Sequence, residues 1–435
     1  MKTIINRILL VILVFITGMA TGFAQQPLSL EQAITISLEN NYDLSIAGKR
    51  VETAKISNTW GAAGALPIIS FNGSVSESIN YNDTEDYSNT NVAGDISLNW
   101  VLFDGFSVRI NKQRLEELQM QSEGNAVVVI ESTIQDVILS YFKCLMEKEK
   151  EAMMLSLMEL SNDRYSIVKE MKDLGVNTTY DLLQAQNSYL EDKSTYLLQK
   201  LSYENECKNL NYLLGVDGAS EWELTTPFEK DTLSYEFAVL QDKMLSNNAT
   251  LKNQYIYQSL LEKEIKLAKS SYYPTLSLNA GINANDNTTY YYENTPDRSA
   301  DSYSPSGSLV LSYSIFNGGN RKRALDIAKV NSEIGDTQTD QMEHSLSNQL
   351  YQLYNFYSIR KELLTLSEEQ QQAAQLNLDI SAEKFAQGAI NSFNYRDVQI
   401  LYKNASLGYL DAIYNLIESD TQLLKITGGI LDEYK

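Results

Sequence analysis

Two stretches of the chain alternate between apolar and small polar residues, and a period of two predicts β-strands. The first stretch, about residues 68–103, and the second, about 275–316, each read as two strands joined by a loop. Strands of about eleven residues with one apolar and one Ser/Asn face suit the height of a bilayer. The apolar positions are Ile69, Phe71, Val75, Ile79, Val92, Ile96, Leu98, Trp100 and Leu102, and then Leu276, Leu278, Ile282, Leu309, Leu311, Tyr313 and Ile315.

The rest of the chain carries apolar residues at helical spacing. A helix is expected over about residues 30–66 and another over 237–273, because a proline follows each and prevents the helix from continuing. Longer helical stretches follow the strands, from Gly105 to Gly175 and from Gly318 to Gly388. Such a stretch spans about 105 Å if it is helical throughout. A seven-residue spacing, typical of coiled-coil packing, joins Leu350, Tyr357, Leu364, Leu378 and Phe385.

The order of these elements is repeated because residues recur at a fixed offset, which is the mark of a duplicated structural unit. The chain is expected to turn back at Gly175 and Gly388 into helices that end near Gly215 and Gly428. Asn41, Leu44 and Pro67 recur at one common offset as Asn248, Leu251 and Pro274. Phe103, Gly105, Gly175, Gln186 and Gly215 recur at a second, larger common offset as Phe316, Gly318, Gly388, Gln399 and Gly428.

The two offsets divide the chain into a first repeat, residues 25–226, and a second repeat, residues 227–435. The offset grows by six residues between Pro274 and Phe316. This growth predicts a longer loop in the second hairpin. We expect the loops at residues 81–91 and 286–305, where Asn, Asp, Thr and Tyr are frequent.

Residues 1–24 are expected to be a secretory signal peptide, with an uncleaved membrane anchor as the alternative. Lys2 and Arg7 precede an apolar run over residues 8–16, and small residues follow at Gly22 and Ala24. Without those two basic residues, 33 Lys and Arg stand against 56 Asp and Glu, a formal charge of −23. Such a charge repels nucleic acid and excludes it as an expected partner.

The sequence shows no expected enzyme site, cofactor site or metal site. The only histidine, His344, has no histidine partner for zinc, and no Gly-rich phosphate loop is present. Cys144 and Cys207 lie almost equally far before and after Gly175. If the chain reverses at Gly175, both thiols lie at about the same level along two neighbouring helices. Two small buried apolar side chains are the favoured interpretation, and a disulfide in an oxidising compartment is the alternative.

Four strands are too few to close a barrel in one chain. Two chains would give eight strands, whose interior side chains fill, whereas three would give twelve strands and an open bore. The Ser/Asn face would then line water and the apolar face would meet lipid. The alternative is a soluble β-sandwich, or a sheet that helices cover.

Several short motifs, in this order, resemble those of TolC-like outer-membrane efflux proteins. They are the opening segment from Leu28 to Leu44, Ala65-Leu66-Pro67 before a strand, the Phe-Asp/Asn-Gly turns after each strand pair, the segment from Gly175 to Gln186, and Phe385-Ala386-Gln387-Gly388. The resemblance covers nearly all of the chain after the signal peptide. It implies a mainly α-helical homotrimer in which four transmembrane strands per chain form a twelve-stranded β-barrel in outer-membrane lipid, above a long periplasmic helical barrel.

The resemblance also implies the function and its partners. The trimer would be a passive exit duct of a tripartite efflux or type I secretion system, and would bind a periplasmic adaptor (a membrane fusion protein) and an inner-membrane RND or ABC transporter. The turns would be the periplasmic tips that meet the adaptor. The residues expected there are Leu174, Gly175, Val176, Gly388, Ala389 and Ile390.

The family narrows its entrance with acidic side chains just after these turns, and the candidates in this chain are Asp181 and Asp397. A trimer would then carry a ring of six carboxylates that attracts polyvalent cations. Arg396 beside Asp397 departs from the usual apolar residue and is expected to form a gate-closing pair. Ordinary helix turns and solvated acids are the alternatives. A non-conducting trimeric stalk or adhesin is the alternative function, and planar-bilayer conductance separates it from a duct.

Overall fold

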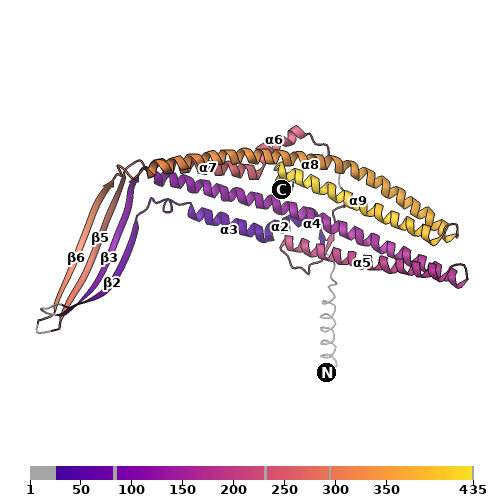
Figure 1. The fold of residues 1–435 in the computed structure, drawn as a ribbon, viewed down its shortest axis with the longest axis horizontal. Coiled ribbons are helices and arrows are strands. Elements are labelled where there is room, and N and C mark those ends of the chain that lie inside the picture. The colour runs from indigo at the N-terminus through magenta and orange to yellow at the C-terminus, as the bar shows by residue number, and fades with distance from the viewer. Residues whose placement is uncertain (1–25, 82–85, 230–232, 293–294, 434–435) are drawn as a thin grey trace, which may run out of the picture. The chain divides into compact units, whose positions relative to one another are not determined.

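The computed structural model describes residues 26–81, 86–229, 233–292 and 295–433 (Figure 1). The signal peptide expected at residues 1–24 lies outside this range. In the described residues, no helix combines the length and the apolar character needed to cross a membrane.

The elements appear in the same order twice along the chain (Figure 1). In each half, two short helices precede a pair of strands, and a helix of 67 residues and a helix of 35 or 36 residues follow them. The first series is β1 Gln26–Leu28, α2 Leu30–Asn40, α3 Tyr42–Ser57, β2 Ile68–Asn80, β3 Tyr87–Asp104, α4 Ser107–Asp173, α5 Thr179–Leu214 and β4 Trp222–Leu224. The second is α6 Phe237–Asn247, α7 Ala249–Ser270, β5 Thr275–Tyr291, β6 Arg298–Ser312, α8 Asn320–Ala386, α9 Ser392–Ile426 and α10 Ile430–Glu433.

The compact units of the fold do not coincide with the sequence repeats. Among the described residues, one unit comprises those within 26–45, 129–248 and 346–433, and the other comprises those within 46–128 and 249–345. Each unit therefore takes segments from both repeats. The first unit holds α5, α9 and the parts of α4 and α8 that pair with them, and the second holds the β-sheet and the first parts of α4 and α8.

The sheet unit contains one antiparallel sheet of four strands in the order β2-β3-β5-β6. The β3–β5 pair joins the two repeats, and it is interrupted by an irregularity between Val101 and Phe103. Apolar residues are paired with apolar residues across the strands, as in Phe71 with Ile96 and Leu278 with Leu309. The alternation read from the sequence is therefore confirmed. Most of these apolar side chains are exposed.

The expectation of a longer second loop is wrong. The strands β2 and β3 are separated by residues 81–86, and β5 and β6 by residues 292–297, which is six residues in both cases. Part of the additional length lies in β5, which has 17 residues where β2 has 13 and pairs at Tyr291 with Tyr87, and part lies between the end of β6 at Ser312 and Phe316. Asn, Asp and Thr side chains do not stop a strand whose backbone is paired on both sides, and this pairing decided the boundary.

The helices expected over residues 30–66 and 237–273 are each broken in two. The breaks lie at Asn41 and Asn248, whose ψ angles of 134° and 119° are not helical. The Asn41 side chain accepts hydrogen bonds from the backbone N–H groups of Asp43 and Leu44 and so caps α3. α3 ends at Ser57, well before Pro67, whereas α7 continues to Ser270.

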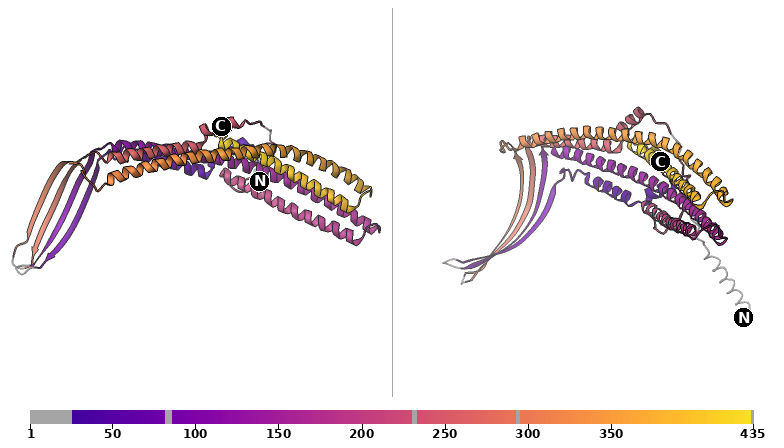
Figure 2. Two further views of the ribbon diagram at one scale, coloured as in Figure 1. Left: turned by 45° about the horizontal axis from the view of Figure 1, so that its top comes forward. Right: turned by 45° about the vertical axis from the view of Figure 1, so that its right-hand side comes forward.

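The helical-hairpin unit buries the expected coiled-coil positions. Leu350, Tyr357, Leu378 and Phe385 are buried, as are the companion positions Leu353 and Ala374. In both views of Figure 2, α9 lies alongside the second half of α8. Arg360, which interrupts the apolar series, forms an ion pair with Glu418 at 2.9 Å across this helix pair. The seven-residue spacing therefore identified the buried face of α8 correctly.

Candidate functional site

The two helical hairpins reverse direction at glycines with the same geometry. Gly175 and Gly388 have φ values of 80° and 71°, a backbone conformation that residues with a Cβ rarely adopt. After the first, the Val176 N–H donates to the Met171 carbonyl at 2.8 Å. After the second, the Ala389 N–H donates to the Lys384 carbonyl at 2.8 Å. Each turn is thus a glycine cap that satisfies the last carbonyls of the preceding helix.

The residues next to these glycines differ in exposure. Leu174 and Val176 expose 80% and 72% of their surface, so the first turn presents two unburied apolar side chains. Ala389 is also exposed. Ile390 is only half-buried and packs against a cluster formed by Val168, Ala185, Leu378, Phe385 and Tyr395. At both glycines a Cβ would meet no atom within 4 Å, so the turns are open on their outer side.

The same cluster shows that the hairpin ends pack asymmetrically. Phe385 stacks on Tyr395 with ring centroids 4.9 Å apart. The position of the first repeat that corresponds to Phe385 holds Lys172, which instead lies 3.6 Å from the carboxylate of Asp173. The second hairpin therefore supplies the aromatic part of the core at this end of the unit.

Asp181 is engaged at the start of α5. Its carboxylate accepts hydrogen bonds from the backbone N–H of Thr178 at 2.8 Å and from its hydroxyl at 2.7 Å. The Thr178 hydroxyl in turn accepts from the Asp181 N–H, which completes a capping box. These two hydrogen bonds, from the backbone and from the side chain of Thr178, lower the pKa of Asp181. The carboxylate is therefore an ionised helix cap.

The corresponding position in the second repeat is Asn394, whose backbone N–H donates to the side chain of the N-cap residue Asn391 at 2.9 Å. Asp397, one helical turn further along α9, is exposed. The structure thus places one candidate aperture acid in a cap and leaves the other on the helix surface.

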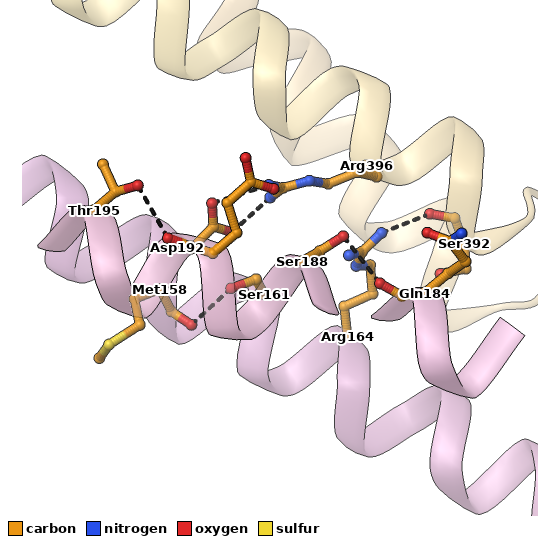
Figure 3. Close-up of polar contacts among 10 residues, drawn as sticks. Met158, Ser161, Arg164, Gln184, Ser188, Asp192, Thr195, Ser392 and Arg396 are labelled. Carbon is orange, nitrogen blue, oxygen red and sulfur yellow. Dashed lines mark hydrogen bonds and ion pairs between the residues drawn. The ribbon is translucent and has the colours of Figure 1, made fainter. Parts of the chain in front are cut away.

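Arg396 pairs with a residue that the sequence did not single out. Its Nη1 and Nη2 atoms lie 2.6 and 2.9 Å from the two carboxylate oxygens of Asp192 on α5 (Figure 3). This side-on geometry with two parallel hydrogen bonds is the strongest that a guanidinium makes with a carboxylate. Asp192 is 2% exposed, so both charges are largely removed from water. The sequence predicted that Arg396 forms an ion pair but did not identify its partner, which is Asp192 on α5.

A second arginine connects the same two hairpins. Arg164 on α4 is 3% exposed, and its Nη1 donates to the Ser392 carbonyl at the start of α9 at 3.1 Å (Figure 3). Burial is the main cause that lowers the pKa of Arg164 to about 10, and the positive charge of Arg396 adds to it. The negative charge of Asp192 opposes this shift. Two cations and one carboxylate therefore share a buried site among α4, α5 and α9.

One signal in the sequence could have identified these residues. Asp192 falls seven residues after the buried Ala185, and Arg164 falls seven residues after the buried Leu157. Charged residues at buried heptad positions are costly unless they are paired. In the described residues, no group of three or more His, Cys, Asp or Glu side chains could hold a metal ion.

The sequence matches a family model described as outer membrane efflux protein over residues 33–216 and 240–429. Among curated proteins, the chain is 19% identical over 413 residues to a probable efflux pump outer membrane protein, TtgC, of Pseudomonas putida, covering 92% of this chain and 83% of that protein. It is 21% identical over 422 residues to the solvent efflux pump outer membrane protein SrpC of Pseudomonas putida, covering 94% and 87%.

Solved structures show the same fold at low sequence identity. The structure of CusC, in a study of folding and transmembrane channel formation, is similar with a TM-score of 0.75 at 16% identity, covering 92% of both chains. The CmeC outer membrane channel of Campylobacter jejuni gives a TM-score of 0.73 at 17% identity, covering 92% of this chain and 85% of that one. The open state of the MtrE outer membrane channel of Neisseria gonorrhoeae gives 0.71 at 17% identity, covering 92% and 89%.

Proposed function

Because the chain belongs to the outer membrane efflux protein family, we propose that it is the exit duct of a tripartite efflux or type I secretion system, gated at the ends of its two helical hairpins. The observation that carries this proposal is the match to the family over both repeats. The relatives are named as outer membrane proteins of efflux pumps, which supports this role. The duct is passive, so a partner must supply the energy.

A homotrimer is the assembly that the sheet favours. In the described residues, β2 and β6 each pair on one side only, so both outer edges of the sheet have free backbone groups. Lipid does not tolerate such edges, and pairing with neighbouring copies removes them. Three copies provide twelve strands with the exposed apolar residues, such as Phe71, Val75 and Leu311, toward lipid.

The assembly is tested by purification and by conductance. Protein extracted from outer membranes should need detergent, have the mass of three chains, and conduct ions in planar bilayers. A soluble monomer would contradict the trimer. A trimer without conductance would instead identify a non-conducting stalk or adhesin.

The exposed apolar residues at the hairpin turns support contact with a periplasmic adaptor that links the duct to an inner-membrane RND or ABC transporter. Leu174, Val176 and Ala389 offer small apolar contacts on rigid, glycine-capped turns, and Gly175 and Gly388 leave room for close approach. Ile390 belongs to the packed cluster and contributes less to this surface. Apolar side chains that anchor in a partner contribute most of the energy of such interfaces.

The adaptor contact is tested with matched charges at the two turns. Leu174→Glu should abolish export while trimers remain intact, because the exposed side chain is not needed for folding. Gln387→Glu places the same charge at the corresponding position of the second repeat, which is already polar and exposed, and should leave export unchanged. Unchanged export in Leu174→Glu would remove this turn from the mechanism.

The gate would open by movement of one hairpin against the other. The pairing of Arg396 with Asp192, and of Arg164 with the Ser392 carbonyl, holds α9 against α4 and α5. Adaptor contact at the turns would bias the helices toward the separated arrangement. Asp181 and Asp397 would line the aperture, with Asp397 the more available of the two acids because Asp181 caps α5.

A further inference from the structure

Two cysteine thiols far apart in the sequence face each other inside the first helical hairpin. Cys144 on α4 and Cys207 on α5 are 63 residues apart, and their Sγ atoms lie 2.8 Å from each other. Both are free thiols in this structure. A movement of less than about 1 Å would bring the sulfur atoms to the bonded distance of about 2.0 Å. The hairpin itself therefore positions the pair for bond formation.

The two thiols differ in accessibility. Cys144 is fully buried and belongs to the same core cluster as Tyr141 and Leu210. Cys207 is half-buried and lines a surface hollow of about 410 Å³, together with Tyr203, Lys208, Asn211 and Trp222 among other residues. A reagent that approaches from solvent can therefore reach Cys207 and cannot reach Cys144.

The two thiols also differ in how readily they ionise, and Cys207 is again the more available of the two. The hydrogen bond from Cys144 lowers the pKa of Cys207, and the same hydrogen bond and burial raise the pKa of Cys144. The thiolate is the nucleophile in thiol chemistry. Cys207 is consequently both the accessible and the more readily ionised member of the pair.

We propose that Cys144 and Cys207 form a disulfide when the exported protein meets a disulfide-bearing donor outside the cytoplasm. The Cys207 thiolate attacks one sulfur of the donor, forms a mixed disulfide and releases the first donor thiolate. Cys144, after losing its proton, attacks the Cys207 sulfur and releases the second donor thiolate. The two protons and two electrons lost by the cysteines leave the donor as a dithiol, so the exchange balances.

The second hairpin has no equivalent crosslink. The corresponding positions of the second repeat hold Tyr357 and Asp420, which are buried and cannot form a covalent bond. The disulfide would prevent α4 from sliding along α5, whereas α8 and α9 would be held together by non-covalent packing alone. The first hairpin would then move as one body, and sliding between helices would be confined to the second.

The test traps the thiols before extraction. Intact cells that express the full-length protein are treated with N-ethylmaleimide and lysed directly into denaturant that contains the same reagent, so that the buried Cys144 also becomes accessible, and the purified protein is analysed by mass. We expect no alkylated cysteine without reduction and two after reduction, with Cys144→Ser and Cys207→Ser each alkylated once. Two alkylated cysteines in the unreduced protein would overturn the proposal, and so would a lasting mixed disulfide on Cys207.

A second measurement tests whether the bond is a structural crosslink. The purified trimer should unfold at a lower temperature after reduction with dithiothreitol, and a Cys144→Ser/Cys207→Ser double variant should unfold at one temperature with or without the reductant. Equal unfolding temperatures for the oxidised and reduced protein would show that no structural crosslink is present. Neither measurement depends on export, so failure here would leave the duct proposal intact.

Discussion

Arg396 and Asp192 lie 204 residues apart in the sequence and join the two helical hairpins by two parallel hydrogen bonds of 2.6 and 2.9 Å. Asp192 is buried, so the carboxylate depends on this guanidinium for the compensation that water would otherwise give. The second arginine, Arg164, donates to α9 beside this pair. The site therefore opposes separation of the hairpins and is the element whose removal tests the gate.

Removing Arg396 should weaken the contact between the hairpins. Arg396→Ala leaves the buried Asp192 charge without its partner, at a cost of about 3–5 kcal/mol for a buried pair. We expect a larger open fraction or conductance in planar bilayers, with the trimer retained. Arg396→Lys should give an intermediate effect, because an ammonium cannot make the bidentate contact.

The control for this change exchanges the charges. Arg396→Asp combined with Asp192→Arg restores an attractive pair and should recover part of the wild-type conductance, whereas each single reversal should not. Conductance of Arg396→Ala equal to that of the wild-type trimer would exclude this ion pair as a gate contact.

The two acids proposed to line the aperture should contribute unequally to cation binding. Asp397 is exposed on α9, whereas the carboxylate of Asp181 is occupied by two hydrogen bonds from Thr178. In a trimer, Asp397→Asn should weaken block of the conductance by a trivalent cation about tenfold, and Asp181→Asn should do so less, because focused carboxylate fields raise the local cation concentration. Equal effects of the two substitutions would contradict the assignment.

The ionisation of Asp181 gives a dependence on pH. Its pKa in the folded protein is lowered by the hydrogen bonds from Thr178, so its contribution to the α5 cap is present above the unfolded pKa of about 3.9 and is lost as the pH falls through the folded pKa. Hydrogen-exchange protection factors at the amides of Thr178, Asp181 and Leu182, which form the cap, should stay constant from about pH 7 to pH 5 and fall only below about pH 4. The second hairpin provides the comparison, because the Asn391 cap has no titratable group.

Much of the fold could be predicted from the sequence because its periodicities are long and regular. The heptad spacing identified Leu350, Tyr357 and Phe385 as buried positions, and the ordered motifs gave the family, which the match over both repeats confirms. The break at Asn41 was missed. The Asn41 side chain caps α3 and so accepts hydrogen bonds in place of helical carbonyls. This replacement leaves the spacing of the apolar residues unchanged, so the periodicity does not reveal the break.

The candidate site was predicted less completely than the fold. The glycine turns were located from single residues, because a positive φ favours glycine. The partner of Arg396 was not identified from the sequence. An ion pair between α5 and α9 depends on how the two hairpins face each other, and the spacing of residues along the chain does not encode that contact. The sequence therefore predicted a pair at Arg396 without its partner, and the structure identifies that partner as Asp192.

The duplication offers a matched pair of glycine substitutions at the turns between strand and helix. A Cβ on Gly105 would clash with the Ser270 carbonyl oxygen, whereas a Cβ on Gly318 would meet nothing within 4 Å. Both glycines have a positive φ, so Gly318→Ala should cost about 1–2 kcal/mol of backbone strain alone. Gly105→Ala should destabilise the trimer further. Thermal unfolding of the two variants measures the difference, and equal losses would show that the close approach to Ser270 relaxes freely.

The helix breaks provide the last comparison between the repeats. The Asn41 side chain donates to the Leu213 carbonyl at 2.9 Å, and the Asn248 side chain donates to the Ile426 carbonyl at 2.9 Å. The Leu213 carbonyl also accepts a hydrogen bond from the Ser37 hydroxyl, and the bond from Asn248 is the more deeply buried.

Leaving a buried group unsatisfied costs about 1–3 kcal/mol. Asn248→Ser should therefore lower the free energy of unfolding more than Asn41→Ser, because serine is too short to reach either carbonyl and only Leu213 keeps a second donor. A larger loss for Asn41→Ser in denaturant unfolding would show that the cap on α3, and not the carbonyl contact, sets the cost at these breaks.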